Sequence, residues 1–434
     1  MDDKRNKPRC DRADATAVLR RLRENGHEAY FAGGCVRDLL LGLEPKDYDV
    51  ATDAPPQRVR DLFTHTQAVG AAFGVILVRH GKSVVEVATF RSDGSYLDGR
   101  RPSEVRFTTA QEDAQRRDFT INGLFFDPLD GDRVIDYVGG REDLESRRLR
   151  AIGDAGARFA EDHLRLLRAV RFAARFGLEI ALLTASAIEA RAGLLKGISP
   201  ERIADELRLM LSPPTRSAAW LLLWKFKLIH VVMRFLPLGE DVRLNPSKSV
   251  FLATAPGAEI SFGLALAAAV LDVELHGGAD VINVVARKNV NRIAKGVDKA
   301  LKLSNVEFEE MEQALGGVAM VLGETPTVAV LKRFLARATS GGSRHLLDAL
   351  EGIGVYEEKI GTLKKRIDEL QGVNVAPEAL ITGDDLSARG LVPGPMFKRI
   401  LEGAYDAQLE GRVKTKEEAM EMAMKIASTR PGSG

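Results

Sequence analysis

The spacing of apolar residues predicts a region of mixed strands and helices followed by a helical remainder. Near the N-terminus, Val18, Leu19 and Leu22 recur at helical spacing between residues 14 and 24, which predicts an amphipathic helix. Apolar and polar residues then alternate over 75–79 and 84–89, with Gly81 between the two runs. This period of two is typical of paired strands joined by a turn. The stretch 262–273 is apolar except for Asp272 but too short to span a membrane, and it predicts a buried helix.

The segment 30–42 combines an apolar run with glycines. The run ends in Gly33 and Gly34, and a short apolar stretch with Gly42 behind it follows. This order predicts a strand, a tight turn, a short helix and a glycine stop. A helix start that follows glycines is a site for phosphate, because its first N–H groups are unpaired and its dipole is positive there. Arg37 in the first turn adds a planar cationic donor.

Two aspartates, Asp47 and Asp49, follow this segment closely. If the stretch is a strand, both side chains fall on one face, because side chains alternate along a strand. Two carboxylates on one face repel each other unless a cation lies between them, and Mg²⁺ is the hard cation that accompanies phosphates. A lone Asp-x-Asp is more often a solvated turn or a helix cap. The glycine motif before it favours metal-assisted phosphoryl or nucleotidyl transfer.

Together, GGCVRD and DYDVAT resemble the signature of the class II nucleotidyltransferases, which comprise the tRNA CCA-adding enzymes and the bacterial poly(A) polymerases of the polymerase-beta superfamily. The resemblance implies an α+β fold, with a nucleotidyltransferase head (a small mixed sheet with helices) over 1–150. An all-α neck with a nucleotide-selecting motif is implied over 151–240, and a helical body and tail that bind tRNA over 241–434. The metal ligands are then Asp47 and Asp49, with Mg²⁺ as the cofactor.

Three further features of the head bear on this resemblance. Relatives place a third acidic residue where Glu86 stands, which could complete the catalytic set, although an exposed strand glutamate is the equal alternative. The glycine-rich stretch 91–106 is too long for a simple turn and is expected to be mobile, like the loop that CCA-adding enzymes use when they switch from C to A. The element RRDFTIN implies that Arg117 contacts the triphosphate together with Gly33, Gly34 and Arg37; the alternative is a structural Arg–Asp pair within RRD.

The stretch 159–172 predicts one helix that carries Asp162 and Arg165 one turn apart, with Arg168 beside Arg165. Because each i,i+3 step drifts by about 60°, Arg171 cannot share one flat face with Asp162. An acceptor beside a donor matches the edges of cytosine and adenine and mismatches guanine and uracil. Alone, such a pair is more often a surface ion pair. It resembles the EDxxR motif, which implies that Asp162 and Arg165 select the base and that Arg168 and Arg171 support them.

Two further helices are predicted, one that begins at ISPERI and one that is rich in cationic residues. In ISPERI, Pro200 stands where a first helical turn tolerates it, and we expect this element to have a structural role. The stretch 287–302 carries six cationic residues against one acid. It could bind RNA phosphate, and a solvated helix face explains it equally well.

Composition limits these readings only weakly. The chain has 434 residues, a formal net charge of +1 and two cysteines, so any RNA contact must come from local basic patches, and a reducing compartment, the cytoplasm, is expected. No secretory signal, membrane partner or obligatory protein partner is evident. The predicted function is CCA addition to the 3′ end of tRNA from CTP and ATP, with release of pyrophosphate. An A-adding tRNA nucleotidyltransferase and a poly(A) polymerase stay open as alternatives.

Overall fold

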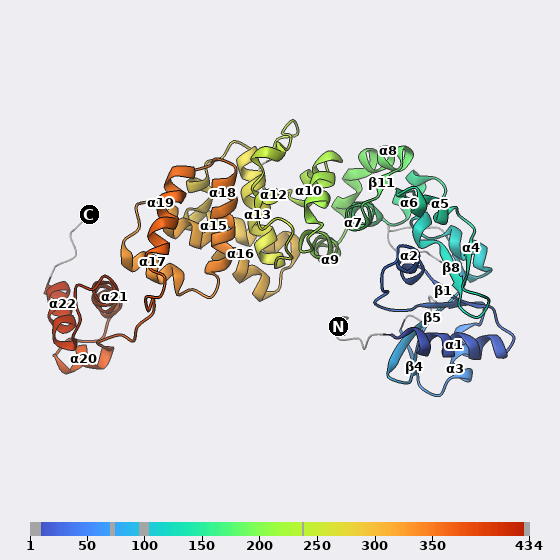
Figure 1. Ribbon diagram of the computed structural model, residues 1–434, viewed down its shortest axis with the longest axis horizontal. Helices are drawn as coiled ribbons and strands as arrows, with labels where there is room; N and C mark the ends of the chain where they lie inside the picture. Colours follow the sequence, from blue (N-terminus) through green and yellow to red (C-terminus); the bar gives the residue numbers. More distant parts are fainter. Residues whose placement is uncertain (1–9, 70–73, 95–103, 237, 429–434) are drawn as a thin grey trace. The chain divides into compact units, whose positions relative to one another are not determined.

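The computed structural model describes residues 10–69, 74–94, 104–236 and 238–428, and the statements below concern those residues. By their contacts they form two compact units, which we describe separately. The first comprises residues 1–210 and 221–232, and the second comprises 211–220 and 233–434. The sheet lies in the first unit and the second is helical (Figure 1), so the predicted α+β class is confirmed. The loop expected to be mobile lies largely outside the described residues.

The main sheet of the first unit has seven strands in the order β3-β4-β5-β2-β1-β8-β9. It is mixed, because β2 and β5 are parallel and the other neighbours are antiparallel. Two further pairs are separate: β6 with β7, and β10 with β11. The bounds are β1 Ala29–Ala32, β2 Val50–Thr52, β3 Thr66–Ala68, β4 Val75–His80, β5 Ser83–Thr89, β6 Arg91–Asp93, β7 Val105–Phe107, β8 Leu124–Asp127, β9 Arg133–Asp136, β10 Arg148–Leu149 and β11 Glu179–Ile180.

Helix α1 (Arg12–Glu24) packs against β1, β4 and β5 beside α3 (Pro56–Leu62) (Figure 1). Its inner face buries the residues that the apolar spacing predicted, and Asp11 caps its start by accepting from two backbone N–H groups. The other helices of this unit are α2 Gly34–Leu40, α4 Ala110–Gln115, η3 Thr120–Asn122, α5 Gly140–Glu145, α6 Ala155–Glu161, α7 Arg165–Phe176, α8 Leu182–Arg191, η4 Ala192–Gly197, α9 Pro200–Leu211 and α11 Ile229–Val232; α10 Arg216–Lys225 spans the division between the units.

The single helix predicted over 159–172 is wrong, because the chain breaks at Asp162. Helix α6 ends at Glu161 and α7 begins at Arg165. Asp162 has extended backbone angles (φ −137°, ψ 104°), and its Oδ1 accepts from the backbone N–H of Leu164 at 3.1 Å. An aspartate that bonds the N–H two residues ahead offers the backbone an alternative to the helix. The argument from one continuous helix face therefore does not apply to Asp162.

Helix α5 follows the glycine pair Gly139 and Gly140. Its first residue, Gly140, lies against η3: an added Cβ would stand 2.2 Å from the carbonyl oxygen of Thr120. Only glycine permits backbones to approach so closely. Helix α5 therefore presses directly on the turn that carries Asn122.

The second unit is built around α13 (Phe262–His276), which packs against α16 (Asn305–Leu322) and is buried from Phe262 to Val273. The buried helix predicted over 262–273 is thus confirmed. Helices α20, α21 and α22 share a separate apolar core. The remaining bounds are η5 Pro246–Lys248, α12 Val250–Ala253, α14 Val281–Val285, α15 Arg287–Leu301, α17 Val328–Leu335, α18 Ser340–Gly352, α19 Glu357–Asp368, α20 Gly383–Ala388, α21 Pro395–Leu409 and α22 Lys416–Ser428.

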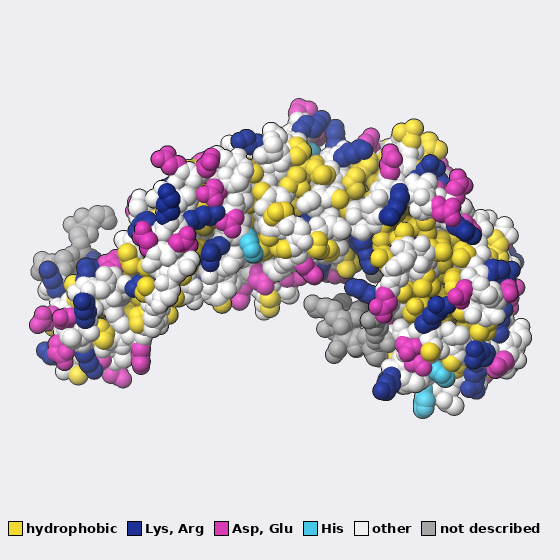
Figure 2. Space-filling view, viewed as in Figure 1, with side chains coloured by type: hydrophobic (Ala, Val, Ile, Leu, Met, Phe, Trp, Pro, Cys, Tyr) yellow, Lys and Arg dark blue, Asp and Glu magenta, His cyan; other side chains and the backbone are white. Residues whose placement is uncertain are grey.

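Charged side chains of both signs are intermixed on the face shown in Figure 2, in keeping with the net charge of +1. None of the described helices combines the length and the apolar character needed to cross a bilayer.

Candidate active site

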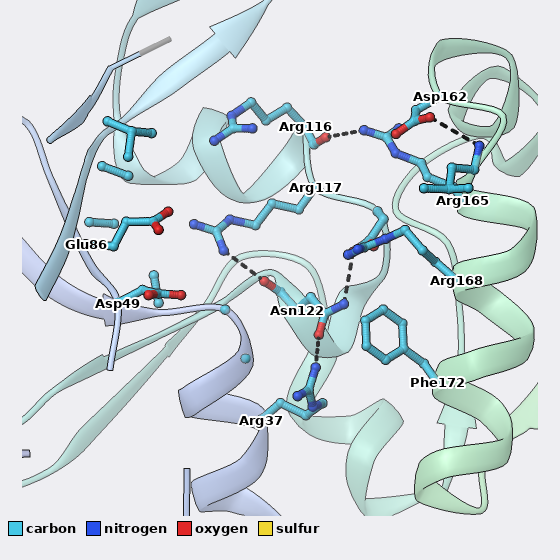
Figure 3. Close-up of a pocket in the computed structure, with 18 of the residues that line it drawn as sticks. Arg37, Asp49, Glu86, Arg116, Arg117, Asn122, Asp162, Arg165, Arg168 and Phe172 are labelled. Carbon is cyan, nitrogen blue, oxygen red and sulfur yellow. Dashed lines mark hydrogen bonds and ion pairs between the residues drawn. The ribbon is translucent and has the colours of Figure 1, made fainter. Parts of the chain in front are cut away.

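A cavity of about 590 Å³ opens in the first unit, and most of the predicted site residues line it (Figure 3). One wall comes from β1, the start of α2, the residue before β2, and β5. The facing wall comes from the α4–η3 connection, the α6–α7 junction, α7 and α9. Its volume is in the range of pockets that hold ligands of nucleotide size.

Carboxylates occupy the sheet side of this cavity. The parallel register pairs Val50 with Val87, so Asp49 and Glu86, one residue earlier on each chain segment, are neighbours and face the same side. Both line the cavity and are half-buried, and Figure 3 shows their carboxylates near the guanidinium of Arg117. Glu86 is thus not the exposed strand glutamate of the alternative interpretation.

Asp47 lies just outside the residues that line this cavity. The expectation that it shares a strand with Asp49 is wrong, because β2 begins only at Val50. The reason is that β1 ends at Ala32, whose N–H bonds the carbonyl of Asp49 at 3.0 Å, and no strand continues opposite the earlier residues. Alternation still holds, since Tyr48 is buried while Asp47 is exposed. The Oδ1 atom of Asp47 accepts weakly from the backbone N–H of Cys10 at 3.4 Å.

The acidic wall fits a hard divalent cation. Within the described ranges, no group of three or more His, Cys, Asp or Glu side chains lies close enough to hold a metal ion by protein ligands alone. A cation that keeps several waters needs fewer: one or two carboxylates together with substrate phosphate oxygens are the usual ligands of Mg²⁺. Asp49 and Glu86 supply hard oxygens of this kind.

The glycine turn and Arg117 stand next to this wall. Gly33 has φ +71°, a left-handed value that favours glycine, and it caps α2. An added Cβ at Gly33 would lie 2.9 Å from Nη1 of Arg117, so this glycine lets the arginine lie against the turn. Arg117 donates to Asp113 from Nε at 3.1 Å and from Nη2 at 2.9 Å, and from Nη1 to the carbonyl of Asn122. The alternative of an Arg–Asp pair within RRD is therefore wrong: the partner of Arg117 is Asp113.

The guanidinium of Arg37 already donates hydrogen bonds to protein side chains. Its Nε and Nη2 donate to Asp38 at 2.9 and 2.6 Å, and its Nη1 donates to Oδ1 of Asn122 at 2.6 Å. Its guanidinium lies over the rings of Phe172 and Phe176 of α7, and only 5% of the residue is exposed. Arg37 lines the cavity while it ties α2 to α7; its contact with a triphosphate stays a prediction.

Asp118 links the RRDFTIN segment to α7. Its Oδ2 accepts from Nε of Arg168 at 2.8 Å, and its Oδ1 accepts from Nδ2 of Asn122 at 3.0 Å. Burial by itself raises the pKa of Asp118, but the charge of Arg168 and these hydrogen bonds outweigh it and lower the pKa to about 2. The carboxylate is therefore ionised throughout the neutral range. Asn122 thereby joins Asp118, Arg37 and Arg117 in one hydrogen-bonded network (Figure 3).

Asp162 and Arg165 stand together at the far end of the cavity, each with a partner of its own (Figure 3). Arg165 donates from Nη1 to Glu161 at 2.5 Å and from Nη2 to the carbonyl of Arg116 at 3.3 Å. Asp162 accepts from Nη2 of Arg202 at 3.0 Å on both oxygens. The alternative in which the two form a surface ion pair with each other is therefore wrong.

The supporting arginines of α7 are also placed at the cavity. Arg168 and Arg171 line it, and Nε of Arg171 donates to Glu206 of α9 at 2.6 Å. Both guanidiniums lie over the ring of Phe172. Burial lowers the pKa of Arg171, the charge of Glu206 opposes that shift, and the side chain stays a cation because an arginine pKa is so high. The break at Asp162 thus brings Arg171 into the same cavity as Asp162.

Among the lining residues that the sequence motifs contained but that were not singled out are Arg116, Asn122 and Arg202. Arg116 and Asn122 stand within RRDFTIN, and Arg202 stands within ISPERI. The letters were available, but nothing in their spacing indicated which side chains meet across the fold.

Comparisons with known proteins agree with this geometry. Residues 29–150 match the poly A polymerase head domain, and residues 177–238 match a probable RNA- and SrmB-binding site of polymerase A. The CCA-adding enzyme of Bacillus pumilus is 46% identical over 198 residues, which cover 45% of this chain and 49% of that enzyme. Poly(A) polymerase I of Salmonella typhi is 45% identical over 204 residues, 44% of each chain. The chain thus aligns with about half the length of these curated relatives.

A solved structure extends the likeness over nearly the whole chain. The CCA-adding enzyme of Bacillus stearothermophilus, in complex with CTP, superposes with a TM-score of 0.69 at 29% identity, covering 96% of this chain and 98% of that one. Fold and matched segments together define a polymerase-type head joined to a helical remainder. Over residues 29–150 and 177–238, and in its fold, the chain is similar to the class II CCA-adding enzymes and bacterial poly(A) polymerases.

Proposed function

We propose that this protein adds CCA to the 3′ end of tRNA without a nucleic-acid template, using CTP and ATP and releasing pyrophosphate. One observation carries the proposal: a single cavity holds an acidic wall, cationic side chains and an acceptor–donor pair that matches cytosine and adenine. The likeness to CCA-adding enzymes supports it.

In this proposal the reaction and the binding of the triphosphate take place at one end of the cavity. The RNA 3′-hydroxyl would attack the α-phosphate of the bound nucleotide near the carboxylates. A divalent cation held by Asp49 and Asp47, which we take to be Mg²⁺, would activate that hydroxyl and neutralise charge on the leaving oxygens. Glu86, which lines the cavity beside Asp49, would be the third carboxylate of this set. Arg117 and the N–H groups at Gly33 and Gly34 would hold the triphosphate, because cationic and backbone donors stabilise phosphate charge.

Base choice would lie at the other end of the cavity. The carboxylate of Asp162 accepts a hydrogen bond from the amino group of cytosine or adenine, and Arg165 donates to the neighbouring ring nitrogen. Guanine and uracil present the reverse pattern and would set acceptor against acceptor. Arg168 and Arg171 would support this pair through their bonds to Asp118 and Glu206.

We further propose that residues 1–150 act as the catalytic head, 151–240 as the nucleotide-selecting neck and 241–434 as the body and tail that bind tRNA. Helix α15 supports the last assignment, because five exposed cationic side chains lie along it: Arg287, Lys288, Arg292, Lys295 and Lys299. Such a face can neutralise RNA phosphates. We place the reaction in the cytoplasm, which is consistent with two free cysteines.

The decisive experiment supplies purified protein and Mg²⁺ with tRNA lacking CCA, and separately with tRNA ending in CC, each with CTP, ATP or both. Addition of three nucleotides to the first substrate supports the proposal. Extension of the CC-ending substrate alone would identify an A-adding enzyme, and long adenylate tails would identify a poly(A) polymerase. Absence of incorporation would overturn the proposed activity.

A further inference from the structure

We propose that Arg202 of α9 is a specificity-determining residue that acts by positioning the carboxylate of Asp162. This inference rests on the proposed function. The ISPERI element that contains Arg202 was expected to have only a structural role, and the structure places its arginine at the wall of the cavity.

Asp162 needs an external support because no helix holds it. It lies in the extended junction between α6 and α7, and the last torsion of an aspartate side chain is broad. Three hydrogen bonds fix its carboxylate. The N–H of Leu164 reaches Oδ1 at 3.1 Å, and Nη2 of Arg202 lies 3.0 Å from each of the two oxygens. A donor equidistant from both oxygens defines how the carboxylate is turned.

The count of lone pairs shows what this arrangement leaves for a base. Each oxygen of a carboxylate accepts about two hydrogen bonds. Oδ1 of Asp162 uses both, with Leu164 and Arg202, whereas Oδ2 uses one. The remaining acceptor site on Oδ2 is therefore the one that an amino group of cytosine or adenine would use.

Arg165 is arranged in the complementary way. Its Nη1 donates to the carbonyl of Arg158 at 3.1 Å and to Glu161 at 2.5 Å, and its Nη2 donates to the carbonyl of Arg116. These three bonds leave its Nε–H and one hydrogen of Nη2 as donors. Glu161 and Arg202 thus hold the two reading groups separately, so that one offers an acceptor and the other offers a donor.

Without Arg202, the carboxylate of Asp162 can turn toward Arg165, three residues along the chain. Pairing between them would use up the acceptor and the donor together, and the base edge would no longer be read. The phosphate end of the cavity is built from other residues and would keep its arrangement. Loss of Arg202 should therefore change the choice of base more than the rate with CTP.

The experiment compares R202Q with R202K and with R208Q, in the full chain with tRNA lacking CCA. Arg208 is a matched control on the same helix, since its Nη1 pairs with the exposed Asp205 at 2.8 Å. The measured quantity is kcat/KM for CTP and for UTP, with thermal melting to confirm that each variant is folded. We expect R202Q to lower the CTP-over-UTP ratio by about tenfold or more, R202K to retain an intermediate ratio because it restores a cation, and R208Q to leave the ratio unchanged.

The double variant R202Q/D162A adds a test that a merely structural role would not pass. If Arg202 acts through Asp162, the double variant should have the same ratio as D162A alone, because the two effects are not additive. A wild-type ratio in folded R202Q, with the ratio lost in D162A, would overturn the role of Arg202 and leave the proposed function intact. A wild-type protein that adds neither C nor A would instead overturn the proposed function, and this inference with it.

Discussion

In the first unit several buried charges lie along the wall of a cavity, among them Asp118 and Arg171, whereas in the second unit Asp272 and Arg216 are enclosed among helices. Asp118 pairs with Arg168, and Arg171 pairs with Glu206; of these four residues, Asp118, Arg168 and Arg171 line the cavity. In the second unit, Asp272 is fully buried and accepts from Nε1 of Trp220 at 2.7 Å. Both arrangements carry the cost of removing charge from water.

The partners show what each buried charge does. Arg216 of the second unit donates to main-chain carbonyls, among them that of Thr254 at 2.6 Å, so it closes the end of α12 and orients no group toward a cavity. The arginines of α7 are bonded on one side and face the cavity on the other. Substitutions at the cavity wall of the first unit should therefore change activity, whereas substitutions of the enclosed charges in the second unit should change stability alone.

The largest effect is expected at the acidic wall. Asp49→Asn should lower nucleotide addition by about 10³-fold, because it removes a charged ligand at the reacting phosphate, and Asp47→Asn is expected to act in the same direction. Folding should be little affected, since clustered negative charge is removed. Steady-state incorporation and thermal melting measure the two quantities. Asp130→Asn, which removes an exposed surface pair with Arg133, is the control; a near wild-type rate for Asp49→Asn would contradict the assignment.

A core carboxylate of the second unit provides the opposite case. Asp272→Ala should lower the free energy of unfolding by about 3 kcal/mol, because it leaves the indole N–H of Trp220 buried without its acceptor. Denaturant titration measures the change. Asp205→Ala, at an exposed side chain, should have little effect. A loss of base selectivity in the folded Asp272→Ala protein would contradict the assignment of this carboxylate to stability alone.

The contribution of the ion pair between Asp118 and Arg168 to stability should depend on pH. The pKa of Asp118 is lowered from 3.8 to about 2 in the folded protein, so its ion pair stabilises the fold above pH 4 and this contribution is lost as the pH falls toward 2. The shift corresponds to about 2 kcal/mol. The difference in unfolding free energy between wild type and Asp118→Asn should therefore be full at pH 6 and shrink by about this amount near pH 2. A difference that does not change with pH would contradict the ion pair.

The smallest effect is expected on α15. Lys288→Gln or Arg292→Gln should weaken tRNA binding a few-fold and reduce the dependence of affinity on salt by up to about one unit of slope for each phosphate contact. Binding titrations at several salt concentrations test this, with Lys82→Gln of the first unit as the charge-matched control. Unchanged salt dependence would favour the solvated helix face that the sequence left open.

Local patterns predicted much of the first unit. The apolar spacing of α1, the alternation of β4 and β5 and the glycine turn at Gly33 each depend on neighbours in the chain, and each was confirmed. The break at Asp162 could not be predicted in this way. The apolar residues around it fit a continuous helix, and only the bonds of its side chain to Leu164 and Arg202 show why the chain departs from one.

Partners distant in sequence were likewise beyond pattern analysis. Asp162 meets Arg202 across 40 residues, and Arg37 meets Asn122 across 85. These residues come into contact only when the sheet, α7 and α9 have packed together. Composition and spacing therefore do not indicate such contacts. The resemblance to a family supplied most of the candidate residues, and the fold supplied the arrangement by which each is held.

The close approach of Gly140 to Thr120 has a consequence for how this sequence can vary. The turn pressed by Gly140 carries Asn122, which joins three residues of the cavity wall, yet Gly140 itself has no side chain and lies outside the lining. At this position the space between two backbones leaves no room for a side chain, whereas exposed residues of α5 such as Arg141 are not limited in this way. A constraint of this kind comes from shape, so a position with no chemistry of its own can be as restricted as the aspartates proposed to carry the reaction.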